Sequence, residues 1–368
     1  MASGKTIVLV SHDAAPSGCF ARLEPILIAR GYEVVKFIDH GKPRQATNDE
    51  IATAVRRTDI LVLGISSSAE LSESAIVAGR VALAARIVFG FYMDVPIGWT
   101  LGKPESYFAE LASHTDFYCG VEPSEPKAAR TIWRKAKFVV TGNPLREEMA
   151  FPRLSRDEVR GKFGLVPDEK AILFTTVKAP GCTFAQMGVL MEALAELATL
   201  SDVKFRLFIS PHPGDRTPFA VDSGTMKPMR IYEEICALSP VSTCVVSAEI
   251  FAGSDLVPGM DLIVEFGSSL ALQAGFSRVP VLTLGPEMLY RCLENVTGSR
   301  FLEAVYNGLS VSVNGNSMTV VNTIKELLAP GEDSSLLDKM IAHQQKFCRI
   351  PSERGQALRL IADLVESF

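Results

Sequence analysis

The chain has 368 residues, of which 47% are hydrophobic and 21% are charged, so it can fill two buried cores and is not intrinsically disordered. Its formal net charge of −5 excludes the broad positive field with which proteins bind nucleic acid. No apolar run reaches the length of a membrane span, and the N-terminus lacks the pattern of a signal peptide.

The first 150 residues alternate short apolar runs with amphipathic stretches. Runs that are apolar throughout are typical of strands covered on both faces, and their alternation with helices predicts a doubly wound parallel sheet. We expect strands at residues 6–10, 33–38, 59–65, 86–91, 116–120 and 138–141. We expect helices at residues 18–30, 48–57, 72–85, 106–113 and 126–136.

The same alternation begins again after a polar, proline-containing stretch at residues 146–157, which we interpret as a domain boundary. The Gly-Asn-Pro sequence just before this boundary breaks a strand, so residues 142–146 are predicted to form a hinge. In the second half we expect strands at 171–177, 204–210, 243–247, 262–265 and 279–284. We expect helices at 184–200 and from residue 269, a further element at 229–238, and a final helix between 351 and 365.

The sequence therefore predicts an α/β protein with two Rossmann-like, doubly wound domains. The first would comprise residues 1–150 and the second residues 151–350. The helix within residues 351–368 is expected to pack back towards the first domain.

Polar residues follow the first predicted strand. Because ligands bind at the carboxyl ends of strands in open α/β sheets, the small turn that ends at Gly18 is expected to leave amides free for an anion or a sugar. His12 and Asp13 lie where a reacting group would sit and are candidates for an acid or base, although Asp13 is also suited to cap the next helix. Asp94 follows the fourth predicted strand and is either a second candidate base or a turn carboxylate.

A basic run follows the fifth predicted strand and contains Lys127, Arg130, Arg134, Lys135 and Lys137. In the helix expected over 126–136, the first three share one face. That face could attract an anionic acceptor or make a peripheral contact with a lipid surface. A solvated helix face is the alternative interpretation.

Two strand ends of the second half carry groups suited to phosphate. Thr176 and Lys178 follow the strand at 171–177 and could donate to phosphate oxygens, although threonine is also common at strand ends without a function. His212 stands between two prolines after the strand at 204–210, so its imidazole is held in place and can donate to a phosphate oxygen.

A third strand end carries a short turn of small residues. Gly267, Ser268 and Ser269 follow the strand at 262–265 and open a helix. The partial positive charge of a helix N-terminus makes this turn a predicted anion site. Ser269 could equally serve only as the helix N-cap.

Taken together, these segments resemble the GT-B glycosyltransferase superfamily, which includes nucleotide-sugar 2-epimerases. The resemblance rests on the order of elements and on four segments: residues 11–18, 139–144, 211–213 and 261–281. It implies two Rossmann-like domains facing across a cleft, with the acceptor on the first and the nucleotide-sugar on the second. It also implies phosphate contacts from His212, Ser268 and Ser269. Gln273 stands where many relatives have a ribose-binding Glu, and it can still hydrogen-bond a ribose hydroxyl.

The leading hypothesis is therefore a metal-independent glycosyltransferase without a cofactor, and the absence of an Asp-x-Asp triplet from the sequence agrees with metal independence. The enzyme would move a sugar from a nucleotide-sugar donor, with UDP as one possible nucleotide, to the hydroxyl of a carbohydrate or lipid-linked acceptor. Seven scattered cysteines without a Cys-x-x-Cys pair argue against a zinc site and predict free thiols in the cytoplasm. The alternatives are a UDP-GlcNAc 2-epimerase-like enzyme and a non-catalytic nucleotide-sugar-binding protein. The sugar, the stereochemistry and the oligomeric state stay open.

Overall fold

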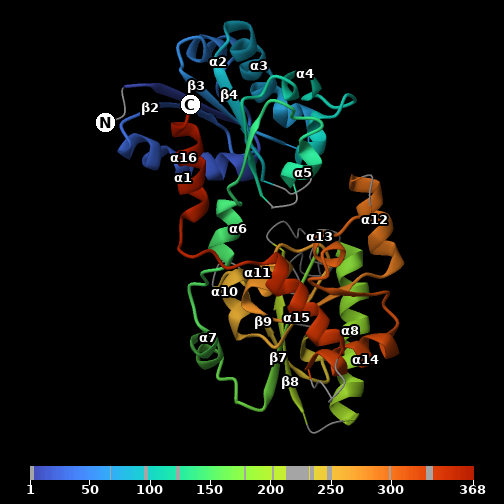
Figure 1. The fold of residues 1–368 in the computed structure, drawn as a ribbon. Helices are drawn as coiled ribbons and strands as arrows, with labels where there is room; N and C mark the ends of the chain where they lie inside the picture. The colour runs from blue at the N-terminus through green and yellow to red at the C-terminus, as the bar shows by residue number, and fades with distance from the viewer. Residues whose placement is uncertain are drawn as a thin grey trace, which may run out of the picture. The chain divides into compact units, whose positions relative to one another are not determined.

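The computed structural model describes residues 4–66, 68–94, 98–121, 125–177, 180–200, 203–212, 232, 236–246, 251–297, 300–328 and 335–368. The chain forms two compact units. The N-terminal unit contains Met1–Glu148 and Pro351–Phe368, and the C-terminal unit contains Met149–Ile350. Each unit is built around a six-stranded parallel sheet, which confirms the predicted fold class (Figure 1).

The N-terminal sheet has the strand order β2-β1-β3-β4-β5-β6. Its strands are β1 (Thr6–Ser11), β2 (Glu33–Ile38), β3 (Ile60–Gly64), β4 (Val88–Tyr92), β5 (Phe117–Gly120) and β6 (Lys137–Val140). The described helices of this unit are α1 (Ala14–Ala29), α2 (Asn48–Val55), α3 (Ala69–Ala85), η1 (Gly98–Gly102), α4 (Ala109–Ala112), α5 (Glu125–Ala129), α6 (Pro144–Met149) and α16 (Gln356–Glu366). Because every strand pair is parallel, the carboxyl ends of the strands meet at one edge of the sheet.

Residues of β1 alternate between two cores. Ile7 and Leu9 belong to the cluster that contains residues of α1 and α16, whereas Val8 and Val10 belong to the cluster that contains residues of α2 and α3. Each such side chain, when fully buried, stabilises the fold by about 2 kcal/mol. Figure 1 shows α16 beside α1, although the two helices stand at opposite ends of the chain.

The N-terminus of α16 is fixed by a buried carboxylate. Glu147, on α6, accepts hydrogen bonds from the backbone amides of Gln356 (2.9 Å) and Ala357 (2.7 Å). These amides are among those that a helix leaves without an internal partner, and the negative charge also suits the positive end of the helix. The last helix is therefore held in the N-terminal unit by its cap as well as by its apolar face.

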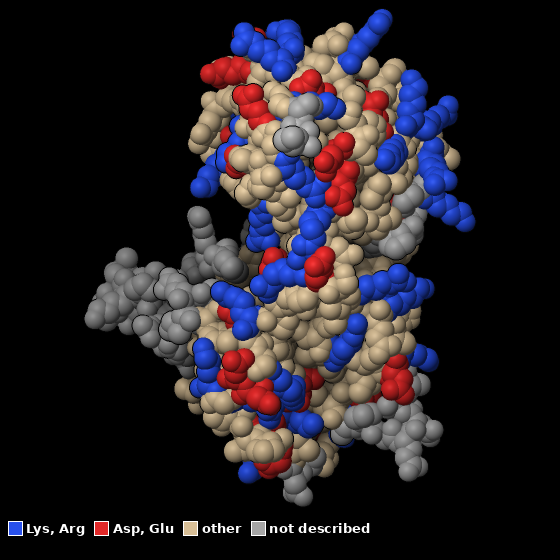
Figure 2. Space-filling view, turned by 60° about the vertical axis from the view of Figure 1, so that its left-hand side comes forward, with Lys and Arg blue, Asp and Glu red and all other residues tan. Residues whose placement is uncertain are grey.

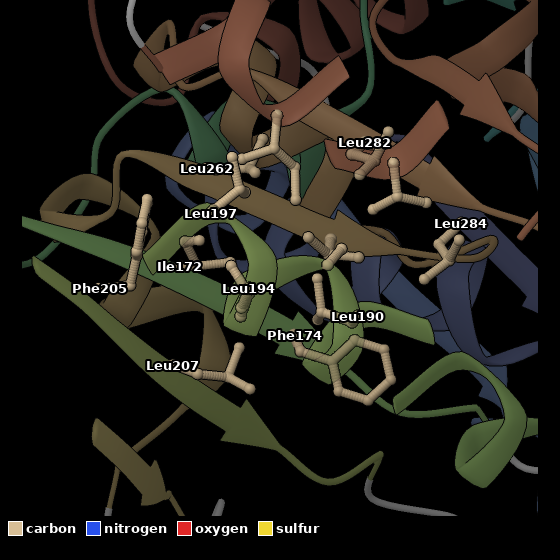
Figure 3. Close-up of a cluster of buried hydrophobic side chains, with 14 of the residues drawn as sticks. Ile172, Phe174, Leu190, Leu194, Leu197, Phe205, Leu207, Leu262, Leu282 and Leu284 are labelled. Carbon is tan, nitrogen blue, oxygen red and sulfur yellow. The ribbon is translucent and has the colours of Figure 1, made fainter. Parts of the chain in front are cut away.

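The C-terminal sheet has the strand order β12-β11-β10-β7-β8-β9. Its strands are β7 (Glu169–Thr175), β8 (Lys204–Ser210), β9 (Ser242–Val245), β10 (Leu262–Glu265), β11 (Val281–Leu284) and β12 (Val311–Val313). The described helices are α7 (Arg156–Lys162), α8 (Pro180–Leu200), α10 (Gly253–Leu256), η2 (Val257–Gly259), α11 (Leu270–Ser277), α12 (Glu287–Thr297), α13 (Glu303–Tyr306), α14 (Ser317–Leu328) and α15 (Ser335–Phe347). One face of this sheet is covered by α8, whose Leu190, Leu194 and Leu197 pack on strand residues such as Phe174 and Leu262 (Figure 3).

Several elements differ from their predictions. The helix expected over 126–136 ends at Ala129, and turns follow it, because Trp133 folds inward to lie against the rings of Phe91 and Tyr118. The predicted common helix face of Lys127, Arg130 and Arg134 is therefore wrong, although all three residues are exposed. Residues 311–313 form an unpredicted strand, and the element expected at 229–238 lies mostly outside the described residues.

In the described parts of the chain, no helix combines the length and the apolar character that crossing a bilayer requires.

Candidate functional site

Asp94 directly follows β4, at the carboxyl edge of the N-terminal sheet. Its backbone carbonyl accepts a hydrogen bond from Asn143 Nδ2 (2.7 Å), at the end of β6. The Oδ1 atom of Asn143 accepts from the amides of Leu145 (2.8 Å) and Arg146 (3.3 Å), so this side chain also caps α6. The predicted strand break at Gly-Asn-Pro therefore has a second effect, since it joins the ends of β4 and β6.

The Asp94 carboxyl group has a perturbed acidity. Burial is the main cause that raises its pKa to about 6; the negative charge of Asp13 acts in the same direction, and the positive charge of Arg146 partly opposes both. A carboxyl with this pKa is mostly ionised at neutral pH and yet accepts a proton far more readily than an exposed aspartate. Asp94 therefore has the properties of a general base.

Asp13 has both carboxylate oxygens engaged. Oδ1 accepts from the amide of Ala14 (2.7 Å), which makes Asp13 the N-cap of α1, and Oδ2 accepts from the hydroxyl of the buried Ser66 (2.7 Å). The backbone carbonyl of Ser66 in turn accepts from the hydroxyl of Tyr107. Asp13 is therefore a positioned second carboxylate beside Asp94, and its capping role, one of two predicted alternatives, is present.

His12 is half-buried, and its ring is oriented by the backbone. Nε2 lies 2.7 Å from the carbonyl oxygen of Lys42. A carbonyl can only accept, so Nε2 carries the hydrogen and Nδ1 is the acceptor of the neutral ring. This contact occupies one of the two ring nitrogens, while the predicted catalytic role of His12 stays a prediction.

The loop before α1 is shorter than expected. The helix begins at Ala14 because Asp13 caps it and Pro16 fits the first turn, where its missing N–H is not needed. The amide of Ser17 already bonds to the carbonyl of Asp13 (3.1 Å), which places Gly18 inside the helix. The prediction that Gly18 belongs to an open, amide-bearing turn was wrong.

Thr176 and His212, both predicted to contact phosphate, lie together at the carboxyl edge of the C-terminal sheet. The hydroxyl oxygen of the buried Thr176, after β7, accepts from the backbone amide of His212 (2.8 Å), after β8. The imidazole of His212 is exposed. Thr176 thus holds the backbone of the neighbouring strand end, while His212 faces solvent. Lys178 lies outside the described residues.

The Gly267–Ser269 turn after β10 is organised by a carboxylate that the sequence pattern did not single out. Glu265 is 1% exposed, and its Oε2 atom accepts from the amide of Ser268 (2.7 Å). Gly267 has a φ of 71°, a left-handed conformation that glycine adopts without strain. The hydroxyl of Ser268 accepts from the amide of Leu270 (3.2 Å), whereas Ser269 makes no capping bond. The Ser268 side chain thus accepts from the first amide of α11, while Ser269, at the N-cap position, is exposed and its predicted ligand contact stays a prediction.

Neither protein-family models nor curated proteins match the chain. Solved structures do. A Listeria monocytogenes protein assigned as a UDP-N-acetylglucosamine 2-epimerase is similar with a TM-score of 0.60 and 14% identity, over 99% of this chain and 96% of its own. The UDP-GlcNAc 2-epimerase of Neisseria meningitidis, bound to UDP-GlcNAc, gives a TM-score of 0.56 and 14% identity, over 99% and 100%. MurG of Acinetobacter baumannii gives a TM-score of 0.59 and 12% identity, over 100% of both chains.

The chain has the GT-B fold. The fold suggested by the sequence resemblance is thus confirmed, by neighbours that match nearly the whole chain. At identities this low, the similarity concerns the fold alone.

Within this GT-B fold, Gln273 has a structural partner. Its Nε2 atom donates to the carbonyl of Ser254 (2.5 Å), and the side chain is buried in α11. The nitrogen is therefore already used in tying α11 to α10. The expected ribose contact stays a prediction, and it would have to come from Oε1.

Glu265 is the functional candidate that sequence reasoning missed. The available signal was its position: Glu265 is the acidic last residue of an apolar strand, two residues before Gly267. Burial raises the pKa of its carboxyl to about 7, although hydrogen bonds from Thr283, Ser268 and Gly267 lower it. Among the described residues, no group of three His, Cys, Asp or Glu side chains is arranged to hold a metal ion.

Proposed function

We propose that this chain is an enzyme that acts on a nucleotide-sugar, and that it transfers the sugar to an acceptor hydroxyl. The observation that carries the proposal is Asp94, a half-buried carboxyl with a pKa of about 6 at the carboxyl edge of β4. The Neisseria meningitidis neighbour was solved with UDP-GlcNAc bound, which supports a nucleotide-sugar as the substrate.

In the proposed reaction, Asp94 takes the proton of the acceptor hydroxyl while that oxygen attacks the anomeric carbon. The bond between the anomeric carbon and the donor's phosphate oxygen breaks, and its electron pair leaves with the nucleotide. The positive charge of Arg146 partly opposes the effect of burial on the pKa of Asp94, which at about 6 leaves the carboxyl mostly ionised at neutral pH. Asn143 fixes the backbone of Asp94 through its carbonyl.

The C-terminal unit would bind the donor's phosphates. We propose that the N-terminus of α11, the hydroxyl of Ser269 and the imidazole of His212 stabilise the charge on the leaving group. Thr176 contributes by holding the backbone amide of His212. These groups are donors or positive dipoles, so we propose that no metal ion is required, and turnover should persist in EDTA.

A second candidate reaction is epimerisation at C2 of the sugar. It is favoured by the negative charge of Asp13, which raises the pKa of Asp94, because two carboxyl groups that act on one another can serve as base and acid. The Neisseria and Listeria neighbours are an epimerase and a protein assigned as one.

The acceptor and the compartment are further parts of the proposal. Figure 2 shows several Lys and Arg side chains together on one side of the N-terminal unit. The exposed residues Lys127, Arg130 and Lys135 suit an anionic or lipid-linked acceptor. All seven cysteines are free thiols, and we infer that the chain works in a reducing compartment such as the cytoplasm.

One experiment separates the candidate reactions. The protein is incubated with UDP-GlcNAc in D₂O, with and without a panel of carbohydrate and lipid-linked acceptors, in the presence and absence of EDTA. Release of UDP that depends on an acceptor, without deuterium at C2, supports transfer, whereas deuterium at C2 supports epimerisation. Asp94→Asn should abolish turnover, and Asp168→Asn, which changes an exposed aspartate, should leave it intact. Binding without turnover under every condition contradicts the enzyme proposal.

A further inference from the structure

A chain of buried hydroxyl groups ends on the carboxylate of Glu265. Oε1 accepts a hydrogen bond from the hydroxyl of Thr283 on β11 (2.5 Å), and Thr283 Oγ1 lies 2.8 Å from Ser310 Oγ. All three side chains are buried. Thr283 has a single hydroxyl proton and gives it to the carboxylate, so Ser310 must donate to Thr283. Both hydroxyl protons therefore point towards Glu265 when its carboxyl group is ionised.

The same carboxylate shapes the turn that we assign to phosphate. Oε2 holds the amide of Ser268, and the amide of Gly267 also contributes to stabilising the ionised form. A Cβ atom on Gly267 would lie 3.4 Å from Leu302, so the segment before α13 packs against this turn. The amide of Ser310 donates to the carbonyl of Ala304 (3.3 Å), which lies within α13. Glu265 is thus linked by hydrogen bonds to the turn at Ser268 and, through Thr283, to Ser310.

Among the described residues, none supplies a positive charge that acts on the carboxylate of Glu265. Burial and the three hydrogen bonds account for its acidity, and no charged side chain of the described residues contributes. Two titratable groups lie near the adjacent Phe266. Cys182 of α8 belongs to the same hydrophobic cluster, and burial raises its pKa to about 11, while the ring of Tyr290 of α12 meets the ring of Phe266 edge to face. His212 stands two strands away, after β8.

We propose that Glu265 is a positioning residue that couples phosphate binding at the Gly267–Ser269 turn to the uptake of one proton by its own carboxyl group. This inference rests on the proposed nucleotide-sugar substrate. A phosphate at the turn brings negative charge close to a buried carboxylate, and protonation from solvent removes the repulsion. The proton enters on Oε1, so Glu265 then donates to Thr283, and Thr283 donates to Ser310. Oε2 continues to accept from Ser268, and the turn keeps its shape.

The test measures UDP-GlcNAc binding by calorimetry between pH 6 and pH 8. Both phosphates of this probe are fully ionised diesters, so the ligand itself does not titrate in that range. For a carboxyl whose pKa rises by one unit on binding, the affinity should fall roughly fivefold from pH 6 to pH 8. The binding heat should depend on the ionisation enthalpy of the buffer, with the sign of proton uptake.

The variants identify the group that takes up the proton. Glu265→Gln keeps the shape and an acceptor for Ser268 but cannot titrate, so its affinity and binding heat should lose the pH and buffer dependence. His212→Gln should keep proton uptake even where it weakens binding. Thr283→Val removes a donor to the ionised form, so the pH at which affinity falls should move upwards, and this variant also provides the test if Glu265→Gln does not fold.

Four results would overturn the inference. Proton uptake that persists in Glu265→Gln assigns it to another group. If Glu265→Gln binds UDP-GlcNAc more weakly than the wild type by the same factor at every pH, so that the pH dependence of the affinity is unchanged, Glu265 has a purely structural role. Absence of binding to UDP-GlcNAc, UDP and CDP at every pH overturns the proposed function as well, whereas binding without pH dependence contradicts this inference alone.

Discussion

Replacing Asp94 by asparagine should stabilise the fold while it removes the proposed base. The carboxyl pKa rises from 3.8 to about 6 on folding, so the ionised side chain is disfavoured in the folded state. At about 1.4 kcal/mol per pKa unit, and with allowance for a side chain that is only half-buried, this penalty is about 2–3 kcal/mol. Asparagine has the same size and no charge, and the bond from Asn143 is retained because it ends on the backbone carbonyl.

The sign of the effect fixes its pH dependence. Below pH 3.8 the carboxyl is neutral in both states and imposes no penalty. As the pH rises to about 6, the unfolded chain releases its proton more readily than the folded chain, so the wild type loses stability over this window. The advantage of Asp94→Asn should therefore be full at pH 8 and nearly absent at pH 4.

The measurement is urea unfolding followed by circular dichroism at pH 4, 6 and 8, with Asp168→Asn as the exposed control. We expect a gain of about 2–3 kcal/mol at pH 8 and a loss of kcat of about 10²–10⁴-fold for Asp94→Asn. A variant that is less stable than the wild type at pH 8, or that gains equally at pH 4, would refute the burial argument. Unchanged turnover would refute the catalytic role of Asp94.

Substitutions at three further positions test how the N-terminal unit is held. Asn143→Ala should cost about 1–2 kcal/mol through loss of the α6 cap, whereas Asn143→Asp keeps the cap but loses the donor to Asp94 and should lower turnover more than stability. Glu147→Ala leaves two amides of α16 without their charged partner and should cost about 3 kcal/mol in urea unfolding, with early proteolysis of the last helix. Gly64→Ala would place a Cβ atom 2.6 Å from Pro16 Cβ, so the thermal midpoint should fall with a loss of about 1–3 kcal/mol, and an unchanged midpoint would mean that α1 shifts freely.

The sheets could be predicted from the sequence because their strands are buried on both faces. Residues 7–10 are apolar without alternation, and the structure explains this, since neighbouring residues of β1 enter two different cores. The same holds for β10, where Leu262 and Val264 pack under α8 while Ile263 packs on the opposite face. Parallel pairing then places every strand end at one edge, which is why the sequence alone points to residues such as Asp94 and Thr176 as candidates for a site.

Local signals failed where a tertiary contact decided the outcome. Pro16 and Gly18 predicted a loop before α1. The helix nevertheless starts at Ala14, because Asp13 caps it and Pro16 needs no hydrogen-bond partner for its nitrogen in the first turn. The residues after Ala129 have a helical charge pattern, but burying Trp133 between aromatic rings outweighs it. Glu265 looked like the polar end of a strand, because its partners Thr283 and Ser310 come from distant parts of the chain.

The raised pKa values of Asp94 and Glu265 predict the two opposite limbs of the pH profile of kcat/KM. Asp94 must be ionised to accept a proton, so kcat/KM for the donor should rise as the pH passes about 6. Glu265 must be protonated when phosphate binds, so kcat/KM should fall as the pH passes about 7. The profile should therefore be bell-shaped with its maximum between these values, and Glu265→Gln should remove the alkaline limb while it leaves the acid limb in place. An alkaline limb that survives in this variant belongs to another group, and an acid limb that moves with it would mean that the two carboxyl groups do not act independently.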